Sequence, residues 1–322
     1  MSKQYAIGID VGGTKIAAGL VDRAGQILCR YTTRAHAQQQ PSFVIETIVQ
    51  TYRAILHQSG IDPAQISAVG LGFPGNTNGR TGLVLGSSNL PAWDHFPLRD
   101  TVAAQVGLPV MLENDANLCA LGEHRFGAGR GTQHMCYVTF STGYGIGMII
   151  NGQLYAGHTG TAGELGHVVI NIGGPPCSCG KLGCIMAYAS GIGISRMVYE
   201  KVDAGVETLL REQLPAPGQR VAAETVALAA QQGDPVASEI LRVAGYYAGV
   251  GLSMIVQILN PELIVIGGGL VNIGPLVWEP ALAAMHEHTQ PELWDSVRVM
   301  PWQLGDDLGI LGAAANVFAE IE

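Results

Sequence analysis

The chain has 322 residues, about the length of two domains at roughly 150 residues each. Hydrophobic residues make up 48% of the chain, which excludes a disordered protein, and only 13% are charged. The 17 basic and 26 acidic residues give a net charge of −9, and no cluster of Lys and Arg supplies the basic face of a general nucleic-acid binder. The composition therefore predicts two domains with sizeable cores and no nucleic-acid partner.

The cysteines and the N-terminus indicate a reducing compartment. Three of the six cysteines lie close together in the sequence and three are scattered through apolar segments, whereas a secreted disulfide framework is usually shorter and denser. The start MSKQYAIGID lacks the apolar core of a signal peptide. The uncharged stretch from Val243 to Pro261 resembles a membrane span in length, but its three glycines and its polar residues favour a buried helix that packs through those glycines. We therefore expect a cytoplasmic protein with no membrane partner.

The first third of the chain predicts a strand, a glycine turn and a second strand, followed by a helix. YAIGI is an apolar run, DVGGTK at Asp10–Lys15 is the turn, and IAAGLVD is the second strand. Pro41 introduces a helix whose apolar residues recur three and four positions apart, and Gly60 ends it. ISAVGLGFPG predicts a buried strand that ends in a turn, Leu98–Val106 a short helix and LPVMLE a strand, and a further helix begins near Asn114.

A second strand–turn–strand unit suggests two α/β domains of related topology. MCYVTF, the turn Ser141–Gly147 and MIINGQL repeat the order and spacing of residues 5–22. After them the sequence predicts a helical stretch to about 258, the strand LIVIGGG and a last helix from near Gly309. The expected domains are an N-terminal one at 1–117, which the last helix at 309–322 is a candidate to join, and a C-terminal one at 118–308.

Three glycine-rich turns are candidates for binding a nucleotide. The turn at Asp10–Lys15 leads into a strand, so it is neither a Walker loop nor a dinucleotide-binding turn, both of which open a helix. The backbone N–H groups of such a hairpin can wrap a phosphate, with Asp10 close by for a hydrated Mg²⁺. The turn at Ser141 offers the same chemistry, and Gly267–Gly269 suits a flat base or a ribose. Each turn alone is more often a plain hairpin; the three together favour a nucleotide.

Four residues in the segment 167–184 have the spacing of a zinc site. Three thiols in a C-x-C-x₄-C pattern and one imidazole make a closed Cys₃His set, and the surrounding Gly and Pro let one loop wrap the ion. The alternative is three reduced cysteines in a loop. Since no ligand position is left open, we expect the zinc to be structural and to fix the histidine and the group on its other nitrogen. The ligands are His167, Cys177, Cys179 and Cys184.

The run Glu113-Asn114-Asp115 places a carboxylate at the start of a helix. Such a carboxylate is often only a cap. It can also be kept ionised by the helix dipole and accept the proton of a hydroxyl group. Glu164, three residues before His167, is a candidate to face the same site, and its alternative is a solvated loop residue.

Together these motifs resemble the ROK family of sugar kinases, the group that includes bacterial glucokinases and N-acetylmannosamine kinases. The resemblance implies an actin/hexokinase-like fold, with two α/β domains and a cleft between them where ATP and a sugar meet. The matching segments run in order from residue 7 to 315: IGIDVGGTK, GFPG, SNLPAW, ENDANLCALGE, STGYGIG, AGELGH, CSCGKLGC, IVIGGG and ILGAAA.

The resemblance also implies roles for single residues. Asp115 would be the general base that takes the proton of the sugar 6-hydroxyl, and the zinc ligands carry over unchanged. ATP with Mg²⁺ is the implied phosphate donor, glucose the default substrate, and a homodimer the most common assembly. The implied sugar-binding residues are Gly75, Asn89, Asn114, Asp115, Glu164 and His167. The implied nucleotide-binding residues are Asp10, Gly12, Gly13, Thr14, Lys15, Thr142, Gly143, Gly268 and Gly269.

Two departures from the family pattern keep alternatives open. Ser141 replaces the first Gly of the usual GTG turn. Met186 stands where the family usually has a Glu that accepts hydrogen bonds from hydroxyls near the anomeric carbon, and a thioether is a poor acceptor. The alternatives are a kinase for N-acetylmannosamine or another hexose, and a sugar-binding protein with weakened kinase activity. The family's repressor branch carries an N-terminal helix-turn-helix, for which the early first strand at Tyr5 leaves no room.

Overall fold

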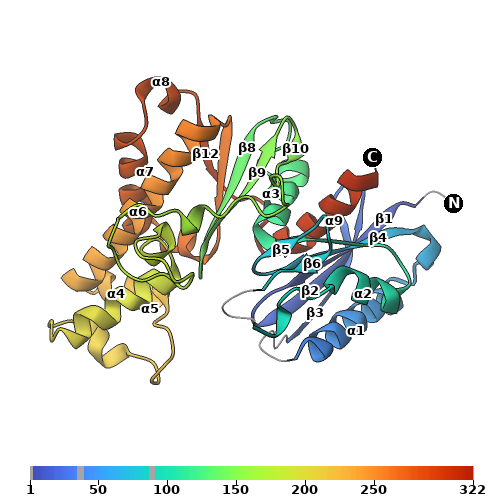
Figure 1. The fold of residues 1–322 in the computed structure, drawn as a ribbon, viewed down its shortest axis with the longest axis horizontal. Coiled ribbons are helices and arrows are strands. Elements are labelled where there is room, and N and C mark those ends of the chain that lie inside the picture. The colour runs from blue at the N-terminus through green and yellow to red at the C-terminus, as the bar shows by residue number, and fades with distance from the viewer. Residues whose placement is uncertain (1–2, 35–39, 87–90, 322) are drawn as a thin grey trace. The chain divides into compact units, whose positions relative to one another are not determined.

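A computed structural model describes residues 3–34, 40–86 and 91–321, which divide into two compact units (Figure 1). The first unit comprises Met1–Tyr137, Gly147–Gly163 and Trp302–Glu322, and the second comprises Val138–Ile146 and Glu164–Pro301. The first unit thus runs beyond residue 117 and contains the last helix, α9 (Leu308–Ile321).

The first unit is built on a sheet with the strand order β3-β2-β1-β4-β7. The three N-terminal strands pair antiparallel, and β1, β4 and β7 run parallel to one another. The register sets Asp10 beside Gly72 and Phe73 beside Asn114, so the carboxyl ends of the parallel strands meet at one edge. In α/β sheets this edge is where ligands bind. The strands are β1 (Tyr5–Val11), β2 (Lys15–Asp22), β3 (Ile27–Arg34), β4 (Ile66–Phe73) and β7 (Val110–Asn114).

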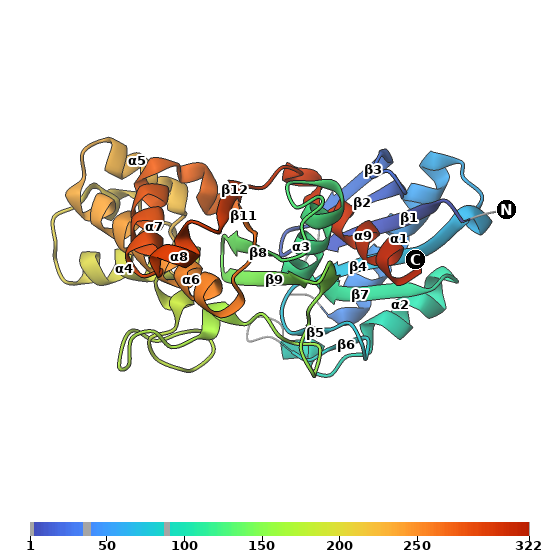
Figure 2. The ribbon, with the colours of Figure 1, turned by 90° about the horizontal axis from the view of Figure 1, so that it is seen from above.

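Helices cover both faces of this sheet (Figures 1 and 2). Alternate residues of β1 point to opposite faces: Ile7 and Ile9 join the core under α1 (Pro41–Ser59) and α2 (Leu98–Val106), whereas Ala6 joins the core under α9. A Cβ atom on Gly8 would lie 2.1 Å from the carbonyl oxygen of Ile310. Glycine at this position therefore lets α9 approach the sheet closely, and α3 (Asp115–Phe126) packs against α9.

The second sheet has the order β10-β9-β8-β11-β12, and its two longest strands, β8 (Met135–Phe140) and β9 (Tyr144–Ile150), run through both units. Its other strands are β10 (Gln153–Leu154), β11 (Leu263–Gly267) and β12 (Arg298–Pro301). The helices of the second unit are α4 (Gly191–Asp203), α5 (Ala223–Gln231), α6 (Pro235–Leu259), α7 (Pro275–Glu287) and α8 (Pro291–Trp294). A separate two-stranded sheet in the first unit consists of β5 (Thr77–Asn78) and β6 (Leu83–Val84).

Helix α6 is long and apolar enough to cross a membrane, judged by length and composition alone. Within its unit, 61% of its most apolar window is buried, and it packs along α7. Cβ atoms on Gly245 and Gly249 would lie 2.4 and 2.1 Å from carbonyl oxygens of α7, so the two helices contact through these glycines. This packing confirms the expected buried helix.

Most elements expected from the sequence are present, with two corrections. The expected turn Ser141–Gly147 is shorter, because β9 already begins at Tyr144. Strand β3 was not expected. Its side chains alternate between half-buried and exposed, as in an edge strand, and because several of them are polar the sequence shows no clear apolar alternation. The helical stretch to about 258 comprises α4, α5 and α6.

Candidate functional site

The first glycine turn joins β1 to β2 as a tight hairpin. The N–H of Gly12 donates to the carbonyl oxygen of Lys15 at 2.9 Å, and the turn leads into a strand as expected. Gly13, Thr14 and Lys15 are exposed, and a Cβ atom on Gly13 would meet no atom within 4 Å. The turn is therefore open to a ligand on its outer side.

Asp10 lies at the end of β1, against the first turn of α9. A Cβ atom on Gly309 would lie 2.4 Å from Oδ2 of Asp10, and one on Gly72 would lie 3.3 Å from its Oδ1. Burial, and after it the negative charge of Asp115, raises the pKa of the Asp10 carboxyl to about 6, while Lys15 opposes the shift. The structure thus places both Lys15 and Asp115 within electrostatic reach of Asp10.

Asp115 is the first residue of α3, directly after β7. Its side chain is exposed, and Oδ1 accepts a hydrogen bond from the N–H of Ala116 at 2.9 Å. Asn114 caps the helix: its Oδ1 accepts from the N–H groups of Ala116 and Asn117, and its Nδ2 donates to the carbonyl oxygen of Gly75 at 2.9 Å. Gly75, Asn114 and Asp115 are therefore together, as expected. The expected residue Asn89 lies outside the described residues.

Glu113 is a residue that the sequence reasoning gave no role of its own. It is buried, and its Oε1 accepts from the N–H of Asn114 at 2.8 Å and from Nδ2 of Asn117 at 3.0 Å. Burial raises the pKa of its carboxyl, and these two hydrogen bonds oppose the shift. Glu113 therefore fixes the junction between β7 and α3 from behind. The signal that could have found it was a carboxylate at an inward-facing position of an apolar strand.

The second glycine turn, Ser141–Gly143, stands beside a cavity of about 220 Å³ in the second unit. The cavity is lined by Ser141 and Thr142, by Gly191 at the start of α4, by Gly269 after β11, and by the segment Arg220–Glu224. Two of the expected nucleotide residues, Thr142 and Gly269, thus line one cavity. The sequence reasoning did not find Arg220–Glu224, because these residues form no local motif.

Gly268 lies where the chain leaves β11. Its φ is 95°, and a Cβ atom there would lie 2.5 Å from the carbonyl oxygen of Phe140. Only glycine fits this close approach of β11 to the end of β8 without strain. The conformation of Gly268 therefore sets the position of the next residue, Gly269, which lines the cavity.

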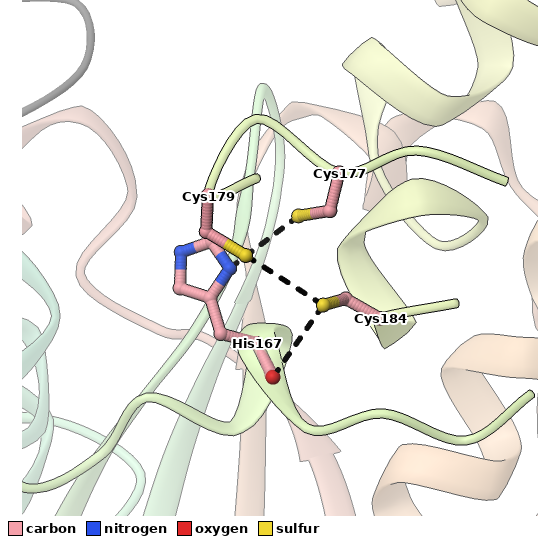
Figure 3. A group of neighbouring side chains, drawn as sticks. All are labelled: His167, Cys177, Cys179 and Cys184. Atoms are coloured by element: carbon pink, nitrogen blue, oxygen red, sulfur yellow. Dashed lines mark hydrogen bonds between the residues drawn. The ribbon is translucent and has the colours of Figure 1, made fainter. Parts of the chain in front are cut away.

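The four expected zinc ligands lie together in the second unit (Figure 3). Their ligand atoms are all within 4.8 Å of one another. In a tetrahedral site with Zn–S about 2.3 Å and Zn–N about 2.0 Å, two sulfurs lie about 3.8 Å apart and a sulfur and a nitrogen about 3.5 Å. The distance between the Sγ atoms of Cys179 and Cys184 is 3.7 Å, and that from Cys177 Sγ to His167 Nδ1 is 3.5 Å. The donor set and its spacing therefore fit a zinc ion.

His167 turns its second ring nitrogen toward Glu164. Nδ1 lies among the thiols, whereas Nε2 is 3.9 Å from Oε2 of Glu164. The Glu164 side chain is 59% exposed and so is available to a ligand. The structure brings Glu164 and His167 together with the zinc ligands of the second unit.

A model of the ROK family matches residues 6–320 of the chain. The chain belongs to the ROK family. The glucokinase of Thermotoga maritima is 37% identical to it over 326 residues, which cover 98% of both chains.

Solved structures of ROK proteins share the fold. The ROK hexokinase from Thermus thermophilus has a TM-score of 0.83 and 32% identity, over 98% of this chain and 99% of that chain. The ROK glucokinase from Streptomyces griseus, solved with glucose and AMPPNP, has a TM-score of 0.79 and 35% identity, over 96% of this chain and 98% of that chain. The expected hexokinase-like α/β fold is therefore confirmed.

The ROK family also includes transcriptional repressors. The xylose repressor of Bacillus subtilis is 29% identical over 97% of this chain, which corresponds to 77% of the repressor. The glucokinase match is higher in identity and covers nearly the full length of both proteins.

Met186, the departure from the ROK pattern, lies between the zinc ligands and the second glycine turn. It follows Cys184 by two residues and packs, half-buried, against the small core that contains Cys177, Cys184 and Tyr188. Its Sδ is 3.5 Å from the place that a Cβ atom on Gly143 would take. A longer or charged side chain at 186 would therefore lie close to the turn at Gly143.

Proposed function

We propose that this ROK family member, an ATP-dependent sugar kinase, transfers the γ-phosphoryl group of ATP to the 6-hydroxyl of glucose, with Asp115 as the general base. The observation that carries the proposal is the exposed carboxylate of Asp115 at the start of α3, within electrostatic reach of Asp10. The glucokinase relatives, 34–37% identical over nearly their whole length, support glucose as the substrate.

The helix position suits Asp115 to this role. The N-terminus of α3 carries a partial positive charge, which favours the ionised carboxylate. Oδ1 accepts a hydrogen bond from the N–H of Ala116, which orients the carboxylate that would accept the proton of a hydroxyl. A positioned base of this kind typically contributes about 10²–10⁴-fold to a rate. In phosphoryl transfer the remainder of catalysis is positioning and charge stabilisation.

Asn114 and Gly75 would position the sugar beside this base. The Oδ1 of Asn114 is occupied by the helix cap and one Nδ2 hydrogen by the carbonyl oxygen of Gly75, so one Nδ2–H remains for a sugar hydroxyl. Because the helix cap and the hydrogen bond to Gly75 fix the orientation of the amide, the remaining Nδ2–H group points in a fixed direction. Glu164 and His167 would contribute further hydroxyl contacts from the second unit.

On the nucleotide side, the turns at Gly12–Lys15 and Ser141–Gly143 would hold phosphates through backbone N–H groups. Asp10 would hold a hydrated Mg²⁺, which supplies positive charge to the transferring phosphoryl group. The cavity beside Thr142, Gly268 and Gly269 would take the nucleoside. Its glycines suit the close approach of a flat base.

The zinc that we propose for His167 and the three cysteines is structural, because all four ligand positions are filled by the protein. With Nδ1 on the metal, the ring is fixed so that Nε2 faces Glu164. Both side chains would then be held in place for the sugar.

We place the enzyme in the cytoplasm as a homodimer, with no nucleic-acid or membrane partner. The net charge of −9 argues against a nucleic-acid partner, and the glucokinase relatives support the cytoplasmic location. The homodimer rests on the resemblance to the ROK family alone. Sedimentation at micromolar concentration tests the assembly, and a mass of one 33.8 kDa chain would contradict it.

The decisive experiment measures sugar-dependent ADP release with a panel of hexoses and assigns the position of the new phosphate by NMR. Glucose 6-phosphate as the main product supports the proposal. Faster turnover of N-acetylmannosamine or another hexose would mean that this sugar, and not glucose, is the substrate. Binding of a sugar without ADP release at any concentration would favour a sugar-binding protein or a regulator over a kinase.

A further inference from the structure

The wall formed by Arg220–Glu224 is the part of the cavity that no motif accounts for. Of the residues that line the cavity, Arg220 and Glu224 are the two with charged side chains. Both are exposed and lie at opposite ends of a five-residue segment that leads into α5. A ligand that enters beside the turn at Ser141–Gly143 therefore meets one cation and one anion on this wall.

This wall is held rigidly to the turn. The N–H of Val221, a buried residue, donates to Oγ of Ser195 in α4 at 3.0 Å. Helix α4 is in turn bonded to the turn: the N–H of Gly191 donates to the carbonyl oxygen of Ser141 at 2.8 Å. A continuous set of contacts thus fixes the distance between the turn and the first residues of α5.

A second contact holds the segment just before the wall. The hydroxyl of Tyr199, also in α4, donates to the carbonyl oxygen of Gln219 at 2.7 Å. Helices α4 and α5 lie side by side in the second unit (Figure 1). Glu224 therefore stands on a preorganised element and not on a free loop.

The chemistry of Glu224 selects what it can bind. An ionised carboxylate accepts hydrogen bonds and donates none. Beside a triphosphate it would repel the phosphates, so it suits an uncharged part of the nucleotide that offers donors. The vicinal hydroxyls of a ribose offer two neighbouring donors, which match the two oxygens of one carboxylate, and an acidic residue has this role in dinucleotide sites.

We infer that Glu224 binds the ribose hydroxyls of the phosphate donor and makes the enzyme selective for ribonucleotides over 2′-deoxynucleotides. This inference rests on the proposed nucleotide-dependent kinase activity. The guanidinium of Arg220 has donors only and cannot accept from a hydroxyl. Its charge acts on the phosphates, which ribo- and deoxynucleotides share.

The test compares kcat/KM for ATP, dATP and GTP in the wild type and in Glu224→Ala and Glu224→Gln. A hydrogen bond to a charged group corresponds to a preference of about tenfold or more for ATP over dATP in the wild type. Glu224→Ala should lower kcat/KM for both nucleotides, because dATP keeps the 3′-hydroxyl, but the fall for ATP should be about tenfold larger and so remove the preference. Glu224→Gln, whose amide oxygen still accepts, should keep part of it. GTP should follow ATP, because the two share the ribose.

Two control variants separate this role from others. Arg220→Ala, in the same cavity, should change ATP and dATP together and keep their ratio. Glu212→Gln, an exposed residue of the second unit outside the cavity, should change neither. An unchanged ATP to dATP ratio in Glu224→Ala would overturn the inference. A loss confined to GTP or to ATP would do so as well, since it would mean that Glu224 contacts the base.

Calorimetric titration without sugar measures the affinities for ATP and dATP independently of catalysis, and so tests the ribose contact separately from the proposed function. If ATP binds more tightly than dATP and Glu224→Ala removes the difference, the ribose contact stands even where no sugar-dependent ADP is released. If the wild type phosphorylates glucose and Glu224→Ala leaves both affinities equal to those of the wild type, the kinase function stands and the ribose contact is refuted. Equal unfolding midpoints of the variants and the wild type show that folding is intact.

Discussion

The charge of Asp115 raises the pKa of Asp10, second only to burial among the causes, and the two together bring it to about 6. Asp10 lies one residue before the end of β1, and Asp115 begins α3 directly after β7, so the parallel sheet places both carboxyl groups at one edge. Two acidic groups held close together destabilise a fold unless a cation or a proton offsets their charge. A bound Mg²⁺ would offset this charge, in agreement with the magnesium-nucleotide site that we propose at Asp10.

Asp10→Asn should stabilise the protein at alkaline pH and not at acidic pH. The pKa of Asp10 rises from about 3.8 to about 6 on folding, so the folded state binds more protons between these values and stability falls as pH rises through them. Above pH 6 the full cost applies, at most about 3 kcal/mol, and the asparagine removes it. Urea unfolding at pH 4 and pH 8 measures this.

The control for this prediction is Asp203→Asn, an exposed residue at the end of α4. It should show no pH-dependent gain. If Asp10→Asn gained the same stability at both pH values, the ionisation of Asp10 would not be the cause.

Asp115→Asn should remove most of the turnover and leave sugar binding largely intact. The amide is close in size to the carboxylate and keeps an oxygen that can accept from Ala116, but it does not take a proton from a hydroxyl. We expect kcat to fall by about 10²–10⁴-fold and the glucose dissociation constant, measured by calorimetry, to change little. A variant that keeps most of its kcat would mean that the base is another residue.

Zinc removal should impair sugar binding through His167. Metal analysis of freshly purified protein should find one zinc per chain, and Cys184→Ser should lose it. Because the proposed ion would fix the ring that faces Glu164, we expect kcat/KM for glucose to fall by about 10–100-fold. Cys29→Ser, far from the ligands in sequence and on β3, is the matched control and should keep both metal and activity. Active protein without zinc would contradict the assignment.

Glu123→Gln should lower the free energy of unfolding and leave kcat unchanged. Glu123 is fully buried in α3, and its carboxylate accepts from the N–H groups of Ala128, Gln303 and Leu304. One carboxylate oxygen accepts from Gln303 and Leu304 and the other from Ala128, whereas an amide has a single acceptor oxygen. At least one of these N–H groups therefore loses its acceptor. The cost is about 1–3 kcal/mol, measured by urea unfolding against the exposed control Glu46→Gln. Equal free energies of unfolding for Glu123→Gln and Glu46→Gln would refute this prediction.

The sequence predicted the local parts of the site because each depends on neighbouring residues. The hairpin at Gly12–Lys15, the cap by Asn114 and the C-x-C-x₄-C loop are all set by short-range pattern. The Arg220–Glu224 wall could not be predicted in this way. Its position depends on a hydrogen bond to Ser195, 26 positions away from Val221, and on the packing of α4 beside it.

The same distinction holds for the fold. Strands β1 and β4 and helix α1 have unbroken apolar patterns, and the sequence predicted them. Strand β3 has polar residues at three of its four exposed positions, Arg30, Thr32 and Arg34, and so resembles a loop in sequence. The unit to which the last helix belongs depends on contacts such as that of Gly8 with Ile310, which join residues 302 positions apart.

Met186→Glu should sharpen selectivity for hydroxyls at C1 and C2 of the sugar. Met186 follows Cys184 by two residues and its thioether accepts hydrogen bonds poorly, whereas the family resemblance implies a carboxylate at this position. A charged acceptor contributes about 1.5–3 kcal/mol, so kcat/KM for glucose should rise by about tenfold or more. The rise should be smaller for 2-deoxyglucose and 1,5-anhydroglucitol, each of which lacks one of the two hydroxyls. Met186→Leu, which adds no acceptor, should leave the selectivity unchanged. Unchanged kinetics of Met186→Glu on every sugar would show that another group already accepts these hydrogen bonds.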